Sequence, residues 1–330
     1  MASVDSSYVC ILILLKSELA KRLDLAGLDS FYAGPSTMSK AQREHVVQFI
    51  TELCEDYRFN GQTAWAAVNL FDRYLSKAVD TPRKQIELIS LSCLLLAAKF
   101  FECRSPCLED LCSVSQKRLS KDDFKSAEQR ILFKLDWDLC IPSPHSFLLH
   151  VTHIMSVRHD GVLSVNSQLI QRRAEFLVDL STFEYAFLAL PLSAVAGASF
   201  VCALRLLRLD CHIECWNEIE NELCSLLDCE QDVLAGAEHQ LMKCYHSCVD
   251  TVSVESKSAP LMKETSFRPV NAKDERMESP DTVLTPPIEG INSENTKSIH
   301  VSHKQSVTCA KPSAFRGATS AGLKRKLESH

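Results

Sequence analysis

Hydrophobic residues recur at intervals of three and four along most of the chain from Ser39 onward, a spacing typical of helices with one buried face. Runs of alternating valine, threonine and tyrosine, which mark strands, are missing from this pattern. The segment 39–58 places its apolar residues on one helical face at Val46, Phe49, Ile50, Leu53 and Tyr57. The sequence therefore predicts an all-α protein.

Capping and stop signals divide the first part of this pattern into five helices. We expect Gly61 to end the first helix and the second to begin near Thr63. Thr81 should cap the third helix, with Pro82 in its first helical position. After a short fourth helix, Ser120 should cap the fifth, whose first turn is acidic.

The same arrangement recurs after the sequence PSP at 142–144, where five further helical segments follow. In each block the third segment is the most apolar and carries small residues about a turn apart, which let neighbouring backbones approach closely. These small residues are Ser92, Cys93 and Ala97 in the first block and Ala198 and Cys202 in the second. We predict two five-helix domains in tandem, at 39–143 and 144–250, after an N-terminal helical segment at 1–38.

Two apolar runs raise the question of a membrane. The run YVCILILL at 8–15 is short and follows no basic residue, so we do not expect a secretory signal. The run YAFLALPLSAVAGASFVCAL at 185–204 is long enough to span a bilayer, but its proline, glycine and small residues suit a helix enclosed by other helices. We therefore expect no membrane-spanning segment, and we expect the first run to form a helix that docks on the first domain or on a partner.

Residues 251–330 differ from the rest of the chain in composition. They include six prolines, 19 serines and threonines and two aromatic residues, so they cannot bury enough apolar surface to offset the entropy of ordering them. We expect this tail to be disordered. Because the tail holds twelve Lys/Arg against nine Asp/Glu, the acidic excess behind the net charge of −6 lies in the first 250 residues. An acidic body binds polyanions poorly, so we expect no nucleic acid partner.

The chain contains 15 cysteines at irregular spacing, several of them inside apolar helical runs. This usage is typical of a reducing compartment, where cysteine serves as a small hydrophobic residue. None of the best candidate pairs has CxxC spacing, so we expect no metal site and no cofactor. The candidates are Cys211/Cys215, Cys224/Cys229 and Cys244/Cys248, with His212 and His246 nearby. A metal-dependent enzyme built on this region is an alternative hypothesis, which stoichiometric zinc in the purified protein would reveal.

Two charged residues fall on or beside the inward faces of consecutive predicted helices. Arg43 lies three residues before the apolar Val46. Asp72 directly follows Phe71 and lies four residues after Val68. Because a charge in such a position needs a partner, we predict that Arg43 and Asp72 form a buried ion pair. The alternative is that each lies at a solvent boundary, where a long side chain reaches water.

Several motifs follow one another in the order of a known family. From about Gln42 to Val151, the sequences QREHVVQFITEL, FDRYLS, SLSCLLLAAKFFE and AEQRILFKLDWDLCIPSPHSFL resemble the cyclin box, and LPLSAVAGASFVCALRLL in the second block resembles a second box. The runs SLSCLLLAAKFFE and WDLCIPS are most similar to J-type cyclins. The five positions that the family uses as signature residues are filled as expected, by Arg43, Asp72, Leu88, Lys99 and Glu128.

The resemblance implies a role for the charged end of the third helix. In cyclins, the lysine there and the glutamate of the fifth helix hydrogen-bond to main-chain groups of a cyclin-dependent kinase, so Lys99 and Glu128 are expected to bind the kinase. Phe101 and Glu102 are expected to bind the kinase as well. Phe101 stands where the family usually has glutamate, so one polar contact would be replaced by an apolar one. Without the resemblance, Lys99 would be a cation at a helix C-terminus and Glu128 an exposed partner for a basic neighbour on its own helix.

The sequence contains no Gly-rich phosphate loop, nucleophile elbow or zinc-protease helix, so we do not expect this chain to be an enzyme. The resemblance implies a regulatory subunit that binds and allosterically activates a cyclin-dependent serine/threonine kinase, in cell-cycle control. The rival hypothesis is a cyclin-fold scaffold or transcription-associated adaptor without a kinase, because a fold alone does not fix function.

A substrate-docking patch is also implied, in weakened form. The patch that some cyclins build from Met, Leu and Trp corresponds here to Gln42, Val46 and Phe49. Glutamine in place of methionine, and phenylalanine in place of the larger tryptophan, predict weak binding of RxL-type peptides.

The tail carries two proline-directed phosphorylation motifs, at Ser279 and Thr285. The sequence VLTPPIEG around Thr285 resembles the phosphodegron read by F-box ubiquitin ligases, with Glu289 as the acidic group four positions on. The alternative is a chance proline-rich linker. A basic run near the end offers a minimal nuclear-import patch, or a solvated charge run, and we expect a nuclear or cytoplasmic protein. This run consists of Lys324, Arg325 and Lys326.

Overall fold

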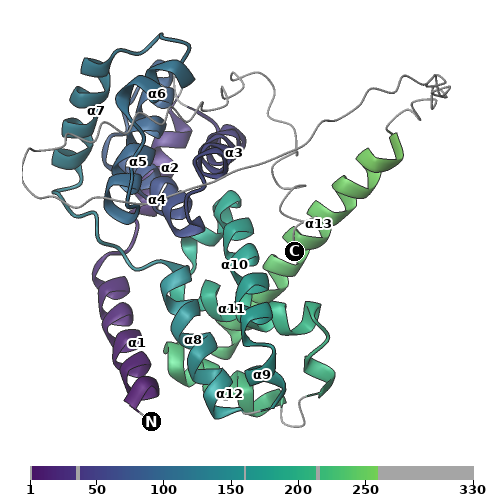
Figure 1. Ribbon diagram of the computed structural model, residues 1–330. Helices are drawn as coiled ribbons and strands as arrows, with labels where there is room; N and C mark the ends of the chain where they lie inside the picture. The colour runs from purple at the N-terminus through teal and green to yellow at the C-terminus, as the bar shows by residue number, and fades with distance from the viewer. Residues whose placement is uncertain (1, 35–37, 160, 213–215, 259–330) are drawn as a thin grey trace, which may run out of the picture. The chain divides into compact units, whose positions relative to one another are not determined.

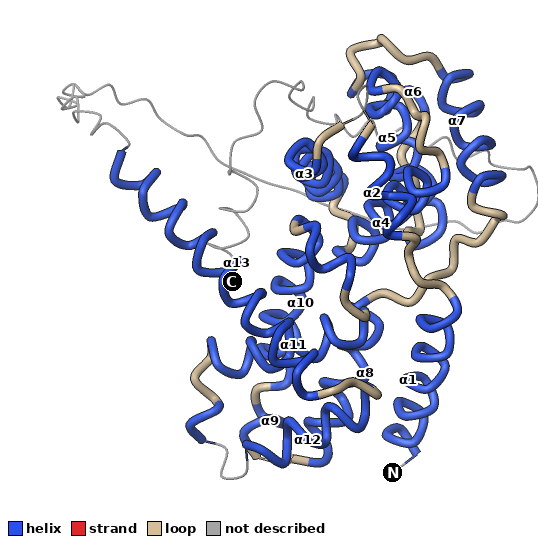
Figure 2. Tube along the Cα trace, turned by 180° about the vertical axis from the view of Figure 1, so that it is seen from behind, coloured by secondary structure: helices blue, strands red, loops and turns tan. Residues whose placement is uncertain are grey.

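The computed structural model describes residues 2–34, 38–159, 161–212 and 216–258, and all regular elements in these ranges are helices (Figure 2). The fold-class prediction is confirmed. Two separate hydrophobic cores lie within this part of the chain, one in each block of helices. Residues 250–258 and a few others are described by their backbone alone.

The first block surrounds one almost fully buried helix (Figure 1). This central helix, α5, packs against α4 and α7 and buries nearly every side chain from Ile89 to Ala98. The block consists of α3 (Lys40–Tyr57), α4 (Gly61–Lys77), α5 (Ile86–Phe101), α6 (Leu108–Val114) and α7 (Lys121–Lys134).

The second block is likewise built around one buried helix, α11, which is buried from Ser193 to Leu204. Its predicted twenty-residue apolar run is interrupted at Pro191, so a 3-10 turn, η2 (Tyr185–Ala189), precedes α11. Among the described residues, no helix combines the length and the apolar character that crossing a bilayer requires. The remaining helices are α8 (Pro144–Arg158), α9 (Val162–Val165), α10 (Ser167–Phe183), α11 (Leu192–Leu206), α12 (Trp216–Leu227) and α13 (Gln231–Ser258).

Two predicted helix boundaries in the first block are wrong. Arg58, in the left-handed conformation with φ of 59°, ends α3, and Gly61 instead opens α4, where the Asn60 side chain accepts a hydrogen bond from the Gln62 N–H. The Thr81 hydroxyl donates to the Ala78 carbonyl instead of capping a helix. A short 3-10 turn follows Pro82, and α5 begins only at Ile86.

The cap predicted for the fifth helix is confirmed. The Ser120 hydroxyl accepts from the Asp123 N–H, and the Asp123 carboxylate accepts from the Ser120 N–H, which forms a capping box. Toward the other end of the chain, the backbone of α13 stays helical to Ser258, beyond residue 251, where we placed the start of the tail.

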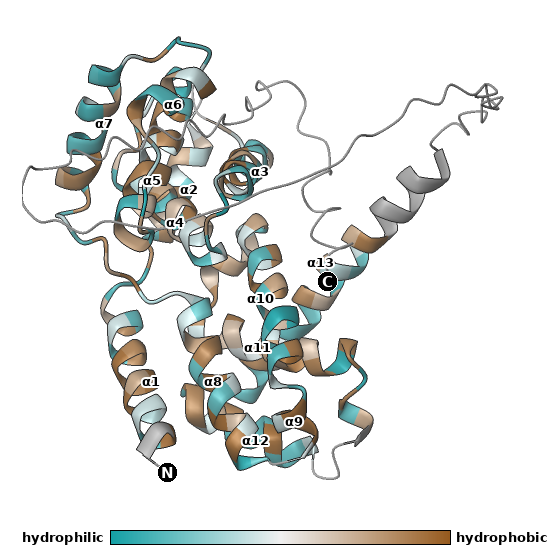
Figure 3. Cartoon of the chain, in the orientation of Figure 1, coloured by the Kyte–Doolittle hydropathy of each residue, from teal (hydrophilic) through white to brown (hydrophobic). Residues whose placement is uncertain are grey.

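The N-terminal segment forms two helices that belong to different blocks. The apolar α1 (Ala2–Ala20), largely brown in Figure 3, packs along α8 of the second block and buries Ile11 in its core. The second helix, α2 (Leu25–Ala33), packs on α4 and buries Leu28 and Phe31 in the first core. We expected the apolar helix on the first block or on a partner, and its contacts with the second block correct that expectation.

Specific polar contacts position α1 on the second block. The Glu18 carboxylate accepts hydrogen bonds from the backbone N–H groups of Leu192 and Ser193, so it caps the N-terminus of α11 from a distant part of the sequence. The Ser7 hydroxyl lies 3.2 Å from Nδ1 of His153 and 3.4 Å from Nδ1 of His150, both on α8.

Arg43 forms a buried ion pair within the first block and also hydrogen-bonds to the second block. Arg43 donates from Nε to Asp72 Oδ1 at 3.0 Å and from Nη2 to Asp72 Oδ2 at 2.7 Å, and both side chains are 1% exposed. Nη1 of Arg43 also donates to the carbonyl oxygens of Thr182 and Phe183, at 3.1 Å each, where α10 ends. Burial disfavours the charged guanidinium, but the Asp72 carboxylate outweighs it and raises the pKa of Arg43.

A second, more exposed link lies near the first. Asp29 of α2 accepts hydrogen bonds from the Tyr185 hydroxyl and from Lys40 Nζ, each at 2.8 Å. Lys40 Nζ also lies 3.8 Å from the centre of the Tyr185 ring. The hydrogen bond from Lys40, and then that from Tyr185, lower the pKa of Asp29. The two blocks are therefore linked through η2 as well as through α10.

We predict that Asp72→Ala lowers the free energy of unfolding by about 3–5 kcal/mol, because it leaves the buried Arg43 guanidinium without its counter-ion. Chemical denaturation followed by circular dichroism measures this loss. The matched control is Asp122→Ala, which removes a carboxylate that is 88% exposed and paired with Lys125, and it should change stability little. Equal midpoints for the two variants would contradict the prediction.

Candidate functional site

The candidate site lies where α5 leaves the first core. Its helix is buried up to Ala98, and the next two side chains, Lys99 and Phe100, reach solvent. Lys99 Nζ donates to Glu128 Oε1 on α7 at 2.5 Å. The Lys99 side chain is 46% exposed and that of Glu128 is 18% exposed. The packing of α5 against α7 thus holds two opposite charges at a fixed position on the surface.

Lys99 lies in the last turn of α5, as local sequence suggests, but Glu128 does not pair with a basic neighbour on its own helix. Lys125, a basic neighbour of Glu128 on α7, pairs with Asp122. Glu128 therefore reaches across to another helix. The pair therefore depends on how α5 packs against α7. A substitution of Lys99 or Glu128 removes the charged partner of a residue on the other helix.

Phe101 and Glu102, predicted beside this pair, turn toward the protein. The Glu102 carboxylate accepts from the Asn60 N–H at 2.9 Å and from the Thr63 hydroxyl at 2.5 Å, so it binds the first turn of α4. Phe101 is partly buried against the first core. Its ring meets that of Phe100 edge to face, with 4.9 Å between centroids. Phe100 is 50% exposed and is the outward aromatic of this pair.

Two further exposed aromatics, which sequence reasoning missed, lie at the C-terminal end of α7. Phe133 is 68% exposed and Trp137 is 63% exposed, and their rings pack edge to face at 6.0 Å. Trp137 has φ of 60° and Asp136 has φ of 55°, a left-handed conformation that is unfavourable for a bulky residue such as tryptophan. The signal available in the sequence was that no glycine follows this helix, so non-glycine residues had to adopt the left-handed conformation that often ends a helix.

Ion pairs fix the backbone around Trp137. Lys77 binds Asp136 at 2.8 Å, and Lys21 binds Asp138 at 2.6 Å. Arg73 donates to the Asp138 carbonyl at 2.9 Å, and burial lowers the pKa of Arg73 more than Asp138 raises it. Non-glycine residues in unfavourable conformations that the surroundings hold in place cluster at functional surfaces.

The other predicted residues of the first block are largely engaged within the chain. Gln42 accepts from the Ser39 N–H in the cap of α3, Val46 is 6% exposed, and Phe49 is partly buried against the core. Leu88 is partly buried against the same core. The predicted docking patch therefore offers little free surface. The tail residues lie outside the described residues, and they are Ser279, Thr285, Glu289, Lys324, Arg325 and Lys326.

The described cysteines of the second block range from buried to exposed: Cys202 and Cys224 are buried, Cys229, Cys244 and Cys248 are partly buried, and Cys211 is exposed. No group of three or more His, Cys, Asp or Glu side chains is arranged there, or elsewhere in the described ranges, to hold a metal ion. Burial raises the pKa of the Cys229 thiol to about 12 and that of Cys244 to about 11, so these thiols stay protonated at neutral pH. Cys215 lies outside the described residues.

Comparison with protein-family models identifies both blocks. Residues 16–140 match the cyclin N-terminal domain, and residues 142–280 match the cyclin C-terminal domain. Human G1/S-specific cyclin-D3 is 28% identical over 216 residues, which cover 66% of this chain and 71% of that protein. Mouse G1/S-specific cyclin-D2 is 24% identical over 74% of this chain and 78% of its own length. Rice cyclin-A1-4 is 29% identical over 51% of this chain and 46% of its own length.

Solved structures share the fold at low sequence identity. A viral cyclin from herpesvirus saimiri matches with a TM-score of 0.51 and 15% identity, over 63% of this chain and 87% of its own. A chain of the yeast RNA polymerase II CTD kinase complex matches with a TM-score of 0.50 and 17% identity, over 68% of this chain and 72% of its own. At this identity the likeness concerns the fold alone.

We predict that an RxL-type peptide binds this protein weakly, because Gln42 is engaged in a helix cap and Val46 is buried. Fluorescence polarisation of a labelled peptide measures the affinity, with a peptide in which Arg and Leu are replaced by Ala as the control. Phe49→Ala should leave the weak signal unchanged. Tight binding that Phe49→Ala abolishes would show that the patch is intact after all.

Proposed function

The chain belongs to the cyclin family, and we propose that it binds and allosterically activates a cyclin-dependent serine/threonine kinase in cell-cycle control. Matches to both cyclin domains support the kinase partner, and the similarity to G1/S-specific cyclins supports the cell-cycle role. The observation that carries the proposal is the Lys99–Glu128 pair at the exposed end of an otherwise buried helix. A J-type subtype stays a prediction from the sequence.

The pair suits recognition of main-chain groups on a partner. Lys99 donates and Glu128 accepts, so together they can bind a carbonyl oxygen and an N–H group at one helix end of a kinase. An exposed ion pair contributes only about 0–1 kcal/mol to stability, so opening it on binding costs little. In the free protein, the mutual contact keeps both side chains in place for a partner, which lowers the entropic cost of association.

Exposed aromatic residues would supply the apolar part of the same surface. Phe100 directly follows Lys99, and Phe133 and Trp137 lie at the end of the helix that carries Glu128. Aromatic side chains dominate the binding energy of many protein interfaces, because they bury a large area with little loss of conformational entropy. We include these three residues in the proposed kinase-binding surface.

Activation would follow from selective binding. A chain that binds better to the kinase conformation with an assembled catalytic Lys–Glu pair shifts the population toward that conformation. The kinase supplies all catalytic groups in this mechanism. The cyclin acts as a regulatory subunit and not as an enzyme.

We predict that the full-length protein recovers a kinase with histone kinase activity from cell lysate, and that the double variant Lys99→Ala/Glu128→Ala loses it. Two charge-assisted hydrogen bonds contribute enough that affinity should fall by about 100-fold. The measurement is a pull-down followed by a kinase assay and mass spectrometry of the bound proteins.

The matched control is Asp122→Ala/Lys125→Ala, which removes another exposed ion pair on α7 and should keep the activity. Circular dichroism establishes that both double variants are folded. Absence of a kinase with the wild-type protein would favour a cyclin-fold scaffold or transcription-associated adaptor over a kinase regulator.

We also propose that phosphorylation of the tail sets the lifetime of the protein. A bound proline-directed kinase would phosphorylate Ser279 and Thr285, and phosphorylated Thr285 with Glu289 would present two anionic groups to an F-box ubiquitin ligase. The support is the sequence VLTPPIEG alone. We propose, likewise from the sequence alone, that the basic run at 324–326 acts in nuclear import and that the protein is nuclear or cytoplasmic.

Thr285→Ala should lengthen the half-life of the protein in dividing cells, measured after translation is blocked. Glu289→Gln should lengthen it less, because it removes only the second anionic contact. Thr308→Ala is the matched control, since this tail threonine is not followed by proline. A half-life that none of the three substitutions changes would remove the degron from the proposal.

A further inference from the structure

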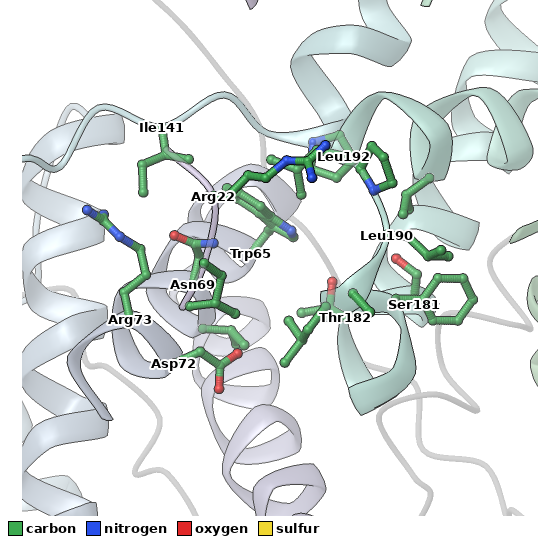
Figure 4. A pocket seen from close by; sticks show the side chains of 18 of the residues that line it. Arg22, Trp65, Asn69, Asp72, Arg73, Ile141, Ser181, Thr182, Leu190 and Leu192 are labelled. Atoms are coloured by element: carbon green, nitrogen blue, oxygen red, sulfur yellow. The ribbon is translucent and has the colours of Figure 1, made fainter. Parts of the chain in front are cut away.

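A cavity of about 300 Å³ lies where the α1–α2 connection, α4, the end of α10 and the η2–α11 connection meet. Figure 4 shows Trp65 and Asn69 of α4 on one side and Ser181, Thr182 and Leu190 on the other. Its volume is at the lower end of the range of small-molecule sites, about 300–1,000 Å³. The Lys99–Glu128 pair does not line it, so the cavity is distinct from the proposed kinase-binding surface.

The walls of the cavity are mixed, with somewhat more apolar than polar surface. Trp65 is 9% exposed, and its ring provides a flat wall. The polar lining includes the Asn69 amide, which makes no hydrogen bond through its side chain among the described residues. Apolar walls offer water few hydrogen bonds, so the filling of this space by an apolar group is favourable. The apolar wall further includes Leu23, Val68, Ile141, Phe187, Leu190 and Val195.

Most charged groups around the cavity already have partners. Arg43 is paired with Asp72, and Lys21 and Arg73 both bind Asp138. Glu18, the remaining acid of the lining, binds the backbone N–H groups that begin α11. The cavity therefore has no unsatisfied negative charge among its described lining residues.

Arg22 is different. This exposed side chain lines the cavity and has no ion pair or hydrogen bond among the described residues. Figure 4 shows it among the side chains that line the cavity. An unpaired guanidinium at the edge of a partly apolar cavity is complementary to a ligand that carries a negative charge at one end of an apolar body.

We propose that this cavity binds a small amphipathic anion: an aromatic or branched apolar body lies between Trp65 and Leu190, and its carboxylate or sulfonate accepts hydrogen bonds from Arg22. Asn69 provides a further polar contact within the cavity. Because the cavity is lined by both blocks, an occupied site would also strengthen their contact. The proposal does not depend on the kinase-binding role.

The test uses anilinonaphthalene sulfonate, a fluorescent amphipathic anion, titrated into the purified full-length protein. We expect saturable binding at one site per chain, with energy transfer from tryptophan to the probe. Arg22→Gln should weaken binding about tenfold, the usual effect of losing a charge-assisted hydrogen bond. Asn69→Leu tests the amide, and it should weaken binding less.

Two controls separate this site from general binding to apolar surface. Arg83→Gln removes an exposed arginine that does not line the cavity, and it should leave the affinity unchanged. The uncharged analogue N-phenylnaphthylamine should bind the wild type and Arg22→Gln equally. Binding of the sulfonate that is unsaturable, or equally strong in wild type and Arg22→Gln, would overturn the proposal, whatever the outcome of the kinase experiment.

Discussion

The arrangement of the two blocks depends on the charge of Arg43. A guanidinium taken out of water needs compensation for most of its donors, and here the Asp72 carboxylate accepts two hydrogen bonds while two carbonyl groups at the end of α10 accept from the third nitrogen. Asp72 belongs to the first block and the carbonyls to the second. The requirement to satisfy one buried cation therefore couples the internal packing of the first block to the placement of the second.

The sequence predicted the helices and their grouping because apolar spacing and side-chain caps are local signals. Ser120 has its acceptor and donor three residues away, and that cap is confirmed. Gly61 was misassigned because it was read as a helix stop, although Asn60 directly before it caps α4 and the left-handed Arg58 ends α3 three residues earlier. The Arg43–Asp72 pairing could be argued from two inward-facing charges of opposite sign. The carbonyl groups of Thr182 and Phe183 carry no side-chain signature, and so the third partner could not be predicted.

In the candidate site, too, local features could be predicted from the sequence, whereas contacts between helices could not. The unusual lysine at the end of an apolar helix was visible in the sequence, whereas its contact with Glu128 depends on how α5 crosses α7. The resemblance to the cyclin box led us to expect Phe101 and Glu102 at the kinase-binding surface beside Lys99. Helix geometry turns Phe101 toward the core, and the chain leaves the helix at Glu102, so neighbouring residues in the sequence face opposite ways. The outward aromatic is Phe100 instead.

The position of α1 has a consequence for how the protein is made. Glu18 caps a helix that begins 174 residues later, and Ile11 fills a core whose other members lie beyond residue 146. On a ribosome, the first helix is synthesised before any of the surface that covers it, and it waits with its apolar side exposed until nearly two hundred further residues have emerged. Domains that fold in order of synthesis complete their contacts as they appear. In this chain α1 is made long before its final contacts can form, and the interval is a time when chaperones have an apolar helix to bind.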